Sequence, residues 1–291
     1  MKVGVIGLGI MGKPIARNLL KANCKIYVND IKEDVLKELE KEGAVISDYK
    51  TIGENCELVL LSLPNGDIVK STVLGENGLI NFLKEKSVVC DTSSITPIQS
   101  KEIYKKLKEK NIGFLDAPVS GGEEGAIAGS LAIMVGGDKS DFDKVAPVFD
   151  IIGNSKILVG DSGSGSATKL INQIIVNLNI ATISEAYMLG EKLGVNLEKV
   201  YEAIKGGLAG SAVLDQKTHR ILEKDFEPGG KISINYKDIN NVMSTAHEIN
   251  CPLFLTANLQ QIMAYLVQSG NENLDHAGIY KYFENLTGRE E

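Results

Sequence analysis

The sequence lacks most of the features that mark metal-binding or disulfide-rich secreted proteins. Its four cysteines lie far apart and form no CxxC pair, which argues against both a disulfide framework and a zinc site. We expect all of them to be buried, reduced thiols: Cys24, Cys56, Cys90 and Cys251. The three histidines show no H-x-x-x-H or H-E-x-x-H spacing, so we expect no metal site.

Basic charge and long apolar runs are also scarce. Asp and Glu outnumber Lys and Arg by 38 to 31, and the basic residues are dispersed without interleaved aromatics. This pattern argues against a nucleic-acid partner. No run reaches the roughly 18 consecutive apolar residues of a membrane span, and the first expected strand begins at Lys2. We therefore expect neither a membrane span nor a signal peptide, and we predict a cytoplasmic protein.

The first thirty residues contain the most specific motif of the chain. A short apolar run at 2–6 leads directly into a match to G-x-G-x-x-G, which consists of Gly7, Leu8, Gly9, Ile10, Met11 and Gly12. A helical pattern and a second strand at 25–29 follow, and this strand ends at Asp30. Strand, glycine turn, helix, strand and acid occur in this order in dinucleotide-binding sites. The alternative is a glycine turn in an unrelated α/β protein.

Each glycine of this motif has a physical role. Gly7 permits the sharp turn, Gly9 lets the backbone approach a pyrophosphate, and Gly12 lets the helix pack closely against the strand. The carboxylate of Asp30 suits both hydroxyls of a ribose and repels a 2′-phosphate. We therefore predict that residues 7–12 and Asp30 bind NAD, with NADP less favoured.

Strands and helices alternate through the first half of the chain. Further strands are predicted at 58–63, 87–91, 113–117, 131–135 and 156–159. The alternation predicts an α/β domain built on a doubly wound, Rossmann-type sheet. Ligands of such sheets lie outside the carboxyl ends of the strands, so Pro64, Ser94 and the loop after Ala117 should converge near the glycine turn.

The composition changes after Gly160. From about Ala167 to Leu193 apolar residues recur at helical intervals, which predicts a helix of ~40 Å. Further helical patterns, with no convincing strand among them, occur at 197–204, 239–249, 255–269 and 277–286. We predict a dinucleotide-binding domain at 1–162 and an all-α substrate and oligomerisation domain at 163–291, joined through the long helix.

Two groups of polar residues are candidates for chemistry. Lys169, Asn172 and Gln173 are spaced i, i+3 and i+4, so they share one helix face. The alternative is an exposed lysine beside two amides that cap backbone groups. The second group lies in the segment 116–122, where a serine and two glycines offer donors that suit a carboxylate. The alternative there is a flexible glycine loop.

Taken together, these motifs resemble those of the β-hydroxyacid dehydrogenases, the family that includes 3-hydroxyisobutyrate dehydrogenase. The resemblance covers nearly the whole chain, with signature-like segments at 7–14, 116–131, 163–169 and 237–238. Within the family, the chain looks most like the tartronate semialdehyde reductase branch at 172–181, 206–211 and 274–276.

The resemblance implies roles for individual residues. It implies Lys169 as the catalytic acid/base. The implied contacts of a substrate carboxylate are Ser120, Gly121 and Gly122, and further cofactor contacts are Leu63, Pro64, Ser94 and Lys237. Many members of the family carry Asn where this chain has Gln173. Either Asn172 or Gln173 therefore takes the role of the amide that holds the substrate hydroxyl or orients the lysine.

Three functions follow as hypotheses. The first is a reductase that converts tartronate semialdehyde to glycerate, and the second is a dehydrogenase of another small β-hydroxy acid, such as 3-hydroxyisobutyrate. The third is a non-catalytic dinucleotide-binding module. The first two differ only in the substrate pocket, for which Ser211 and Asp215 are candidates, with a helix cap and a solvated acid as the alternatives. No metal is needed, because Lys169 supplies positive charge at the carbonyl oxygen.

The long apolar helix also suits burial against a second chain. We therefore expect a homodimer or a homotetramer. The expected small-molecule partner is a carboxylate-bearing aldehyde or hydroxy acid.

Overall fold

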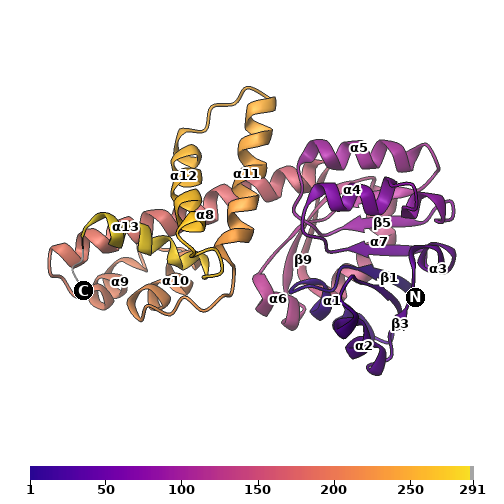
Figure 1. The fold of residues 1–291 in the computed structure, drawn as a ribbon, viewed down its shortest axis with the longest axis horizontal. Coiled ribbons are helices and arrows are strands. Elements are labelled where there is room, and N and C mark those ends of the chain that lie inside the picture. The colour runs from indigo at the N-terminus through magenta and orange to yellow at the C-terminus, as the bar shows by residue number, and fades with distance from the viewer. Residues whose placement is uncertain (289–291) are drawn as a thin grey trace. The chain divides into compact units, whose positions relative to one another are not determined.

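The computed structural model describes residues 1–288 and divides the chain into two compact units, Met1–Lys169 and a second that begins at Leu170. The first unit is a Rossmann-like sheet with helices on both faces, and the second is helical (Figure 1). This confirms the predicted fold class. The domain boundary expected after residue 162 stays a prediction.

The sheet of the first unit has a parallel core and a mixed edge. Its strands are β1 (Lys2–Ile6), β2 (Lys25–Asn29), β3 (Val45–Ile46), β4 (Leu58–Leu61), β5 (Val88–Asp91), β6 (Gly113–Asp116), β7 (Val119–Ser120), β8 (Leu131–Gly137) and β9 (Gly153–Gly160). Their order is β3-β2-β1-β4-β5-β6-β8-β7, with β9 paired to β8. Strands β1 to β6 are parallel, whereas β8 is antiparallel to β6 and β7 is antiparallel to β8. The carboxyl ends of β1, β2, β4, β5 and β6 therefore lie at one edge.

The helices of the first unit connect these strands. They are α1 (Gly12–Lys21), α2 (Glu33–Lys41), α3 (Tyr49–Asn55), α4 (Gly66–Leu74), the 3₁₀ helix η1 (Leu79–Asn81), α5 (Pro97–Lys108), α6 (Gly122–Ala128) and α7 (Lys139–Ile152). Local signals explain several starts. Asn65 caps α4 through its side chain, and α5 begins with a capping box between Thr96 and Gln99 and with Pro97 in its first turn.

Both faces of the sheet are buried, which explains the near-continuous apolar strands. Alternate residues of the central strands belong to two separate cores. Val5 and Leu60 pack with α1 and α7, whereas Val59 and Leu61 pack with α4 and α5. In Figure 1, α4 and α5 lie side by side. Packing in these two cores fixes the positions of the strands, and the candidate site residues follow the ends of those strands.

The second unit is built on the long helix. Its helices are α8 (Ser164–Lys192), which starts in the first unit, and α9 (Leu197–Ile204), α10 (Ala212–Leu222), α11 (Ile232–Glu248), α12 (Phe254–Gln268), the 3₁₀ helix η2 (His276–Ile279) and α13 (Tyr280–Leu286). Helices α11 and α12 pack against each other (Figure 1). The structure agrees with the predicted α8, α9 and α12, but α11 starts earlier than expected and the pattern at 277–286 divides into η2 and α13. Helix α10 was not predicted from the sequence, because the residues between its apolar first and last turns are polar.

One prediction about the cysteines is wrong. Cys56 and Cys90 are buried and Cys24 is half-buried, but Cys251 is exposed in the loop between α11 and α12. Burial raises the pKa of the Cys56 thiol to about 12. Ile249, an apolar neighbour of Cys251 in the sequence, is itself exposed, so the apolar surroundings did not indicate burial.

Across residues 1–288, no helix has both the length and the apolar character needed to cross a bilayer. In the same part of the chain, no group of three or more His, Cys, Asp or Glu side chains is placed to hold a metal ion.

Candidate active site

Two of the three glycines in the turn between β1 and α1 are required by the packing of the protein itself. Gly7 has a φ of +89°, and a Cβ atom there would overlap the carbonyl oxygen of Ser62. A Cβ on Gly12 would overlap the carbonyl oxygen of Gly7. In contrast, a Cβ on Gly9 would meet no atom within 4 Å. The protein itself does not require glycine at this position, and the open space is what the close approach of a pyrophosphate requires.

The start of α1 is suited to an anion. No side chain caps this end, and its first turn contains no acidic residue. The unpaired N–H groups of a first helical turn, together with the helix dipole, attract phosphate. The residues of the turn therefore fit a dinucleotide cofactor.

Asp30 is held beside this turn by two backbone N–H groups. Its Oδ2 accepts a hydrogen bond from Leu8 N–H at 2.6 Å, and its Oδ1 accepts one from Lys32 N–H at 2.8 Å. The next residue, Ile31, is 97% exposed although it is apolar. Sequence reasoning missed Ile31. An apolar residue directly after the acid predicted to bind the ribose was the available signal.

The predicted contacts after β4 and β5 lie on two loops that are tied together. Leu63 N–H donates to Ser93 Oγ at 2.8 Å, and Thr92 Oγ1 donates to the Leu61 carbonyl oxygen at 2.6 Å. Pro64 directly follows Leu63. The neighbouring β4 and β5 therefore bring Leu63, Pro64 and Ser94 to the same edge of the sheet.

The segment 116–122 runs from β6 through β7 into α6. Gly121 and Gly122 have φ values of +135° and +64°, so glycine is required for this backbone. Both are exposed and Ser120 is half-buried. The first turn of α6 also carries two exposed acidic side chains, Glu123 and Glu124, which the sequence prediction of an anion site did not consider.

Lys169 contacts this same segment. Its Nζ donates a hydrogen bond to the carbonyl oxygen of Val119 at 2.8 Å, and its side chain is half-buried. Val119 directly precedes Ser120, and the two make up β7. The structure thus brings the predicted acid/base to the predicted carboxylate-binding segment.

The first turn of α8 is fastened to β6 and α5. The buried Asp116 carboxylate accepts hydrogen bonds from the N–H groups of Gly163 and Ser166, both at 2.8 Å. The hydroxyl groups of Ser100 and Ser166 are 2.8 Å apart. A Cβ on Gly165 would overlap the carbonyl oxygen of Asp116. These contacts set where Lys169, one turn later, begins its side chain.

The amides of Asn172 and Gln173 take part in a polar network of the helical unit. Asn172 Nδ2 donates to Gln173 Oε1 at 2.9 Å. Gln173 Nε2 donates to Asp238 Oδ2 at 2.6 Å and to Asn235 Oδ1 at 3.2 Å. Asp238 Oδ1 also pairs with Lys237 Nζ at 3.0 Å. Gln173 is buried, whereas Asn172 is half-buried.

Asn235 is a second residue that sequence reasoning missed. It lies three residues before Asp238 on α11, so the two share a helix face. A second buried polar residue on the helix face of Asp238 was the available signal.

Ser211 and Asp215, the candidates for the substrate pocket, match the structural alternatives given for them, a helix cap and a solvated acid. Ser211 caps α10 by accepting from Leu214 N–H at 3.0 Å, and Asp215 is exposed.

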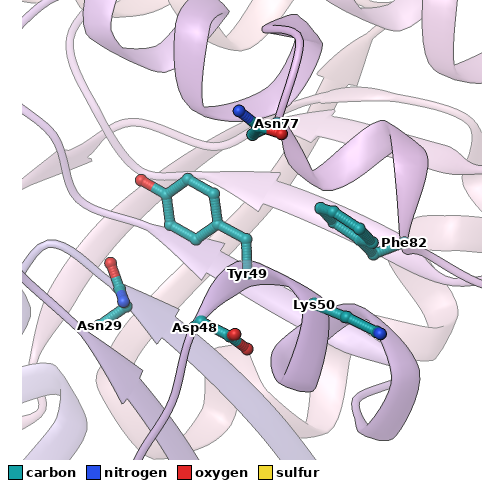
Figure 2. Close-up of a pocket in the computed structure, with 6 residues that line it drawn as sticks. All are labelled: Asn29, Asp48, Tyr49, Lys50, Asn77 and Phe82. Carbon is teal, nitrogen blue, oxygen red and sulfur yellow. The ribbon is translucent and has the colours of Figure 1, made fainter.

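A pocket of about 310 Å³ lies in the first unit beside the end of β2 (Figure 2). Its lining residues are Asn29, Asp48, Tyr49, Lys50, Asn77 and Phe82. None of them is a predicted site residue. The Asn29 side chain donates to the Ser47 carbonyl oxygen at 2.7 Å, and Asp48 caps α3, so both have structural roles.

Two family models match the two parts of the chain. The NAD binding domain of 6-phosphogluconate dehydrogenase matches residues 2–160. The NAD-binding domain of NADP-dependent 3-hydroxyisobutyrate dehydrogenase matches residues 163–283.

Known proteins match the whole chain. It is 38% identical to 2-hydroxy-3-oxopropionate reductase of Escherichia coli (strain K12), over 98% of this chain and 97% of that protein. It is 35% identical to 2-(hydroxymethyl)glutarate dehydrogenase of Eubacterium barkeri, over 99% and 96%. The fold matches a solved structure of Mycobacterium tuberculosis 3-hydroxyisobutyrate dehydrogenase with L-serine, with a TM-score of 0.91, 24% identity and 99% coverage of both chains.

Proposed function

Because the chain belongs to the β-hydroxyacid dehydrogenase family of NAD(P)-dependent oxidoreductases, we propose that it reduces tartronate semialdehyde to glycerate with NADH. The observation that carries this proposal is the hydrogen bond from Lys169 to Val119, directly before Ser120. It joins a candidate proton donor to a candidate carboxylate site. The 38% identity to an enzyme named for 2-hydroxy-3-oxopropionate, another name for tartronate semialdehyde, supports the choice of substrate.

Lys169 acts as the general acid in this proposal. As the aldehyde carbon is reduced, negative charge develops on the carbonyl oxygen, and the ammonium stabilises that charge and donates a proton to it. In the reverse direction the neutral amine accepts the proton of the alcohol. The Val119 carbonyl oxygen keeps the Nζ atom at a defined place between turnovers.

The carboxylate of the substrate is bound by Ser120 and by the N–H groups of Gly121 and Gly122. Their backbone, with positive φ at both glycines, exposes donors to an anion. Fixing the carboxylate fixes which face of the aldehyde receives the hydride. Asn172 and Gln173 complete the proposed substrate site.

All of the proposed cofactor contacts except Lys237 are residues of the first unit, and the cofactor supplies the hydride when bound. Residues 7–12 receive the pyrophosphate, and Asp30 accepts hydrogen bonds from the ribose hydroxyls. The exposed Ile31 offers apolar surface to the adenine. Leu63, Pro64, Ser94 and Lys237 are the further proposed contacts. Because Asp30 repels a 2′-phosphate, we expect NADH to be preferred over NADPH.

A second candidate substrate is another small β-hydroxy acid. It is favoured by the 35% identity to an enzyme named for 2-(hydroxymethyl)glutarate. This reading keeps Lys169 and the cofactor site and changes only the residues that recognise the rest of the acid.

The protein is proposed to act as a homodimer or homotetramer. Ile171, Ile175 and Leu189 recur on one face of α8 and are 58%, 57% and 61% exposed. A second copy of the chain would bury this face. We expect light scattering to show an oligomer and Leu189→Glu to dissociate it, whereas a monodisperse wild-type monomer would contradict the idea.

The test of the proposed function is a set of initial rates with NADH on four aldehydes. We expect kcat/KM for tartronate semialdehyde to exceed that for glyoxylate, succinic semialdehyde and methylmalonate semialdehyde by about tenfold or more. A clear preference for another aldehyde would refute the substrate, and no turnover of any would refute the reductase.

The matching variant is Lys169→Met. Loss of a general acid lowers kcat by about 100- to 10,000-fold. Lys192→Met, at the exposed end of the same helix, is the control and should keep wild-type activity. Unchanged activity of Lys169→Met would show that this lysine is not the acid.

A further inference from the structure

The hydrogen bonds around Gln173 have a direction that chemistry fixes. Asp238 is 3% exposed and is paired with Lys237, so its carboxylate accepts hydrogen bonds and donates none. The group of Gln173 that lies 2.6 Å from Asp238 Oδ2 must therefore be the amide nitrogen, Nε2. This sets the orientation of the Gln173 carboxamide.

Asn235 sets the same orientation independently. Its Nδ2 lies 3.0 Å from the carbonyl oxygen of Lys231 and 3.4 Å from that of Gly230, and carbonyl oxygens only accept. Its Oδ1 therefore faces Gln173 and accepts from Nε2 at 3.2 Å. Both hydrogens of the Gln173 amide are used on the side of α11. Its Oε1 is left to face Asn172.

Asn172 is oriented in turn by Gln173. Because Gln173 Oε1 only accepts, Asn172 must present Nδ2 to it, at 2.9 Å. The carboxamide oxygen of Asn172, Oδ1, is then the atom that does not bond to Gln173. Asn172 is half-buried, whereas Gln173 is buried and turned toward α11, so Asn172 is the amide with a polar atom left for a ligand.

We propose that Asn172 selects a substrate with a hydroxyl group on the carbon next to its carboxylate, and that Gln173, Asn235 and Asp238 are positioning residues that fix the Asn172 oxygen as an acceptor. The inference rests on the proposed function, which puts Asn172 beside the substrate. Asn172 shares a face of α8 with Lys169, three residues earlier. An acceptor pairs with a hydroxyl and is left unpaired by a methyl group, and a ligand that covers a polar atom without pairing with it binds more weakly.

The test compares two ligands that differ only in this group. Glycerate has a hydroxyl and 3-hydroxyisobutyrate a methyl on the carbon next to the carboxylate, and both bind without turnover to the complex of enzyme and NADH. We expect the wild-type enzyme to bind glycerate about tenfold or more tightly than 3-hydroxyisobutyrate, as measured by fluorescence titration. In Asn172→Leu, which keeps the size of the side chain and removes its oxygen, the ratio should fall to about one or below.

Asp238→Asn tests the positioning residues. The new amide can present either its oxygen or its nitrogen to Gln173, so Gln173 and Asn172 are no longer held in one orientation. The ratio should fall by about threefold or more while both ligands still bind. Asn240→Ala is the control, because Asn240 lies on α11 and accepts from Gln260 at 2.8 Å, outside the network. It should keep the wild-type ratio.

The outcomes separate this inference from the proposed function. A wild-type ratio near one, or a ratio unchanged in Asn172→Leu, overturns the role of Asn172, even if tartronate semialdehyde is turned over. A ratio that falls in Asn172→Leu but not in Asp238→Asn overturns the positioning role. A ratio that depends on Asn172 in an enzyme that does not reduce tartronate semialdehyde supports the inference and refutes the proposed reaction.

Discussion

The carboxylate of Asp116 accepts a hydrogen bond from the backbone N–H of Ser166, in the first turn of α8, at 2.8 Å. A second bond, from Gly163 N–H, makes Asp116 the cap of this helix, although it lies on a distant strand. Lys169 follows Ser166 by three residues. The carboxylate thus joins the end of β6, where the proposed substrate segment begins, to the helix that carries the proposed acid.

The first prediction concerns removal of this cap. Asp116→Ala leaves two buried N–H groups without their acceptor, at about 1–3 kcal/mol of unfolding free energy each. The milder Asp116→Asn keeps one acceptor, and we expect it to fold, with kcat lowered because the start of α8 shifts. Denaturant unfolding and initial rates measure both effects. Asp141→Asn, at another buried aspartate of the same unit, should leave kcat unchanged.

The same carboxylate predicts a dependence of stability on pH. Burial raises the pKa of Asp116, against the opposing effect of the hydrogen bonds from Gly163 and Ser166. The folded state therefore holds this proton more tightly than the unfolded state, and the contribution of Asp116 to stability falls as pH rises from the ordinary aspartate range through the raised pKa. We expect Asp116→Asn to lack this decline. An equal decline in the variant and the wild type would contradict the assignment.

A second prediction contrasts two glycines of the turn. Gly12→Ala should unfold at a lower temperature, because its Cβ would overlap the Gly7 carbonyl oxygen. Gly9→Ala should keep the wild-type Tm, because its Cβ meets nothing within 4 Å, yet raise KM for NADH by about tenfold or more. Thermal unfolding and NADH titration distinguish the two. If Gly9→Ala bound NADH normally, the pyrophosphate would not approach at Gly9.

Cofactor choice gives the third prediction. Asp30→Asn keeps an acceptor for Leu8 N–H but loses the charge that repels a 2′-phosphate. We expect the ratio of kcat/KM for NADH to that for NADPH to fall by about tenfold. Glu33→Gln, an exposed acid three residues later, is the control and should keep the ratio. A wild-type enzyme with a lower KM for NADPH than for NADH would overturn the role of Asp30.

The fourth prediction concerns a buried ion pair of the helical unit. Asp275 is fully buried, accepts from Lys217 Nζ at 2.8 Å, and also accepts from the N–H groups of Gly230 and Ala277. Lys217→Met removes the lysine of this ion pair from the buried carboxylate, and we expect a loss of about 3–5 kcal/mol in the free energy of unfolding at neutral pH. Lys199→Met, at an exposed lysine of α9, should change little.

The loss of unfolding free energy in Lys217→Met should depend on pH in a direction that the pKa of Asp275 determines. Burial alone would raise the pKa of Asp275, but His276, Lys217 and the hydrogen bonds outweigh it and hold the pKa below the ordinary value. The contribution of the carboxylate is therefore present above the ordinary aspartate pKa and is lost as pH falls through the lowered one. The difference between wild type and Lys217→Met should shrink on acidification, and Asp275→Asn should restore part of the stability of Lys217→Met. A difference independent of pH would mean that Lys217 acts through packing alone.

The sequence predicted those helices and strands whose formation depends mainly on residues close together in the chain. The strands β1, β2, β4, β5 and β6 and the helices α8, α9 and α12 follow from apolar periodicity and from glycine and proline positions, whereas the two-residue strand β3 was not predicted. Helix α10 was missed because its buried face, with Leu214 and Ile221, is small and its middle is polar. The reversal of β8 was missed because strand direction depends on which strand lies beside it.

The sequence by itself determined the glycine turn, Asp30, the helix of Lys169 and the family to which these motifs belong, because each depends on residues close together in the chain. It left open whether Asn172 or Gln173 faces the substrate. Only the tertiary structure decided the partners of these groups, which lie far along the chain: Val119 for Lys169, and Asn235 and Asp238 for Gln173. Hydrogen-bond direction is set by which atoms can donate and which can only accept, and the fold alone brings those atoms within reach.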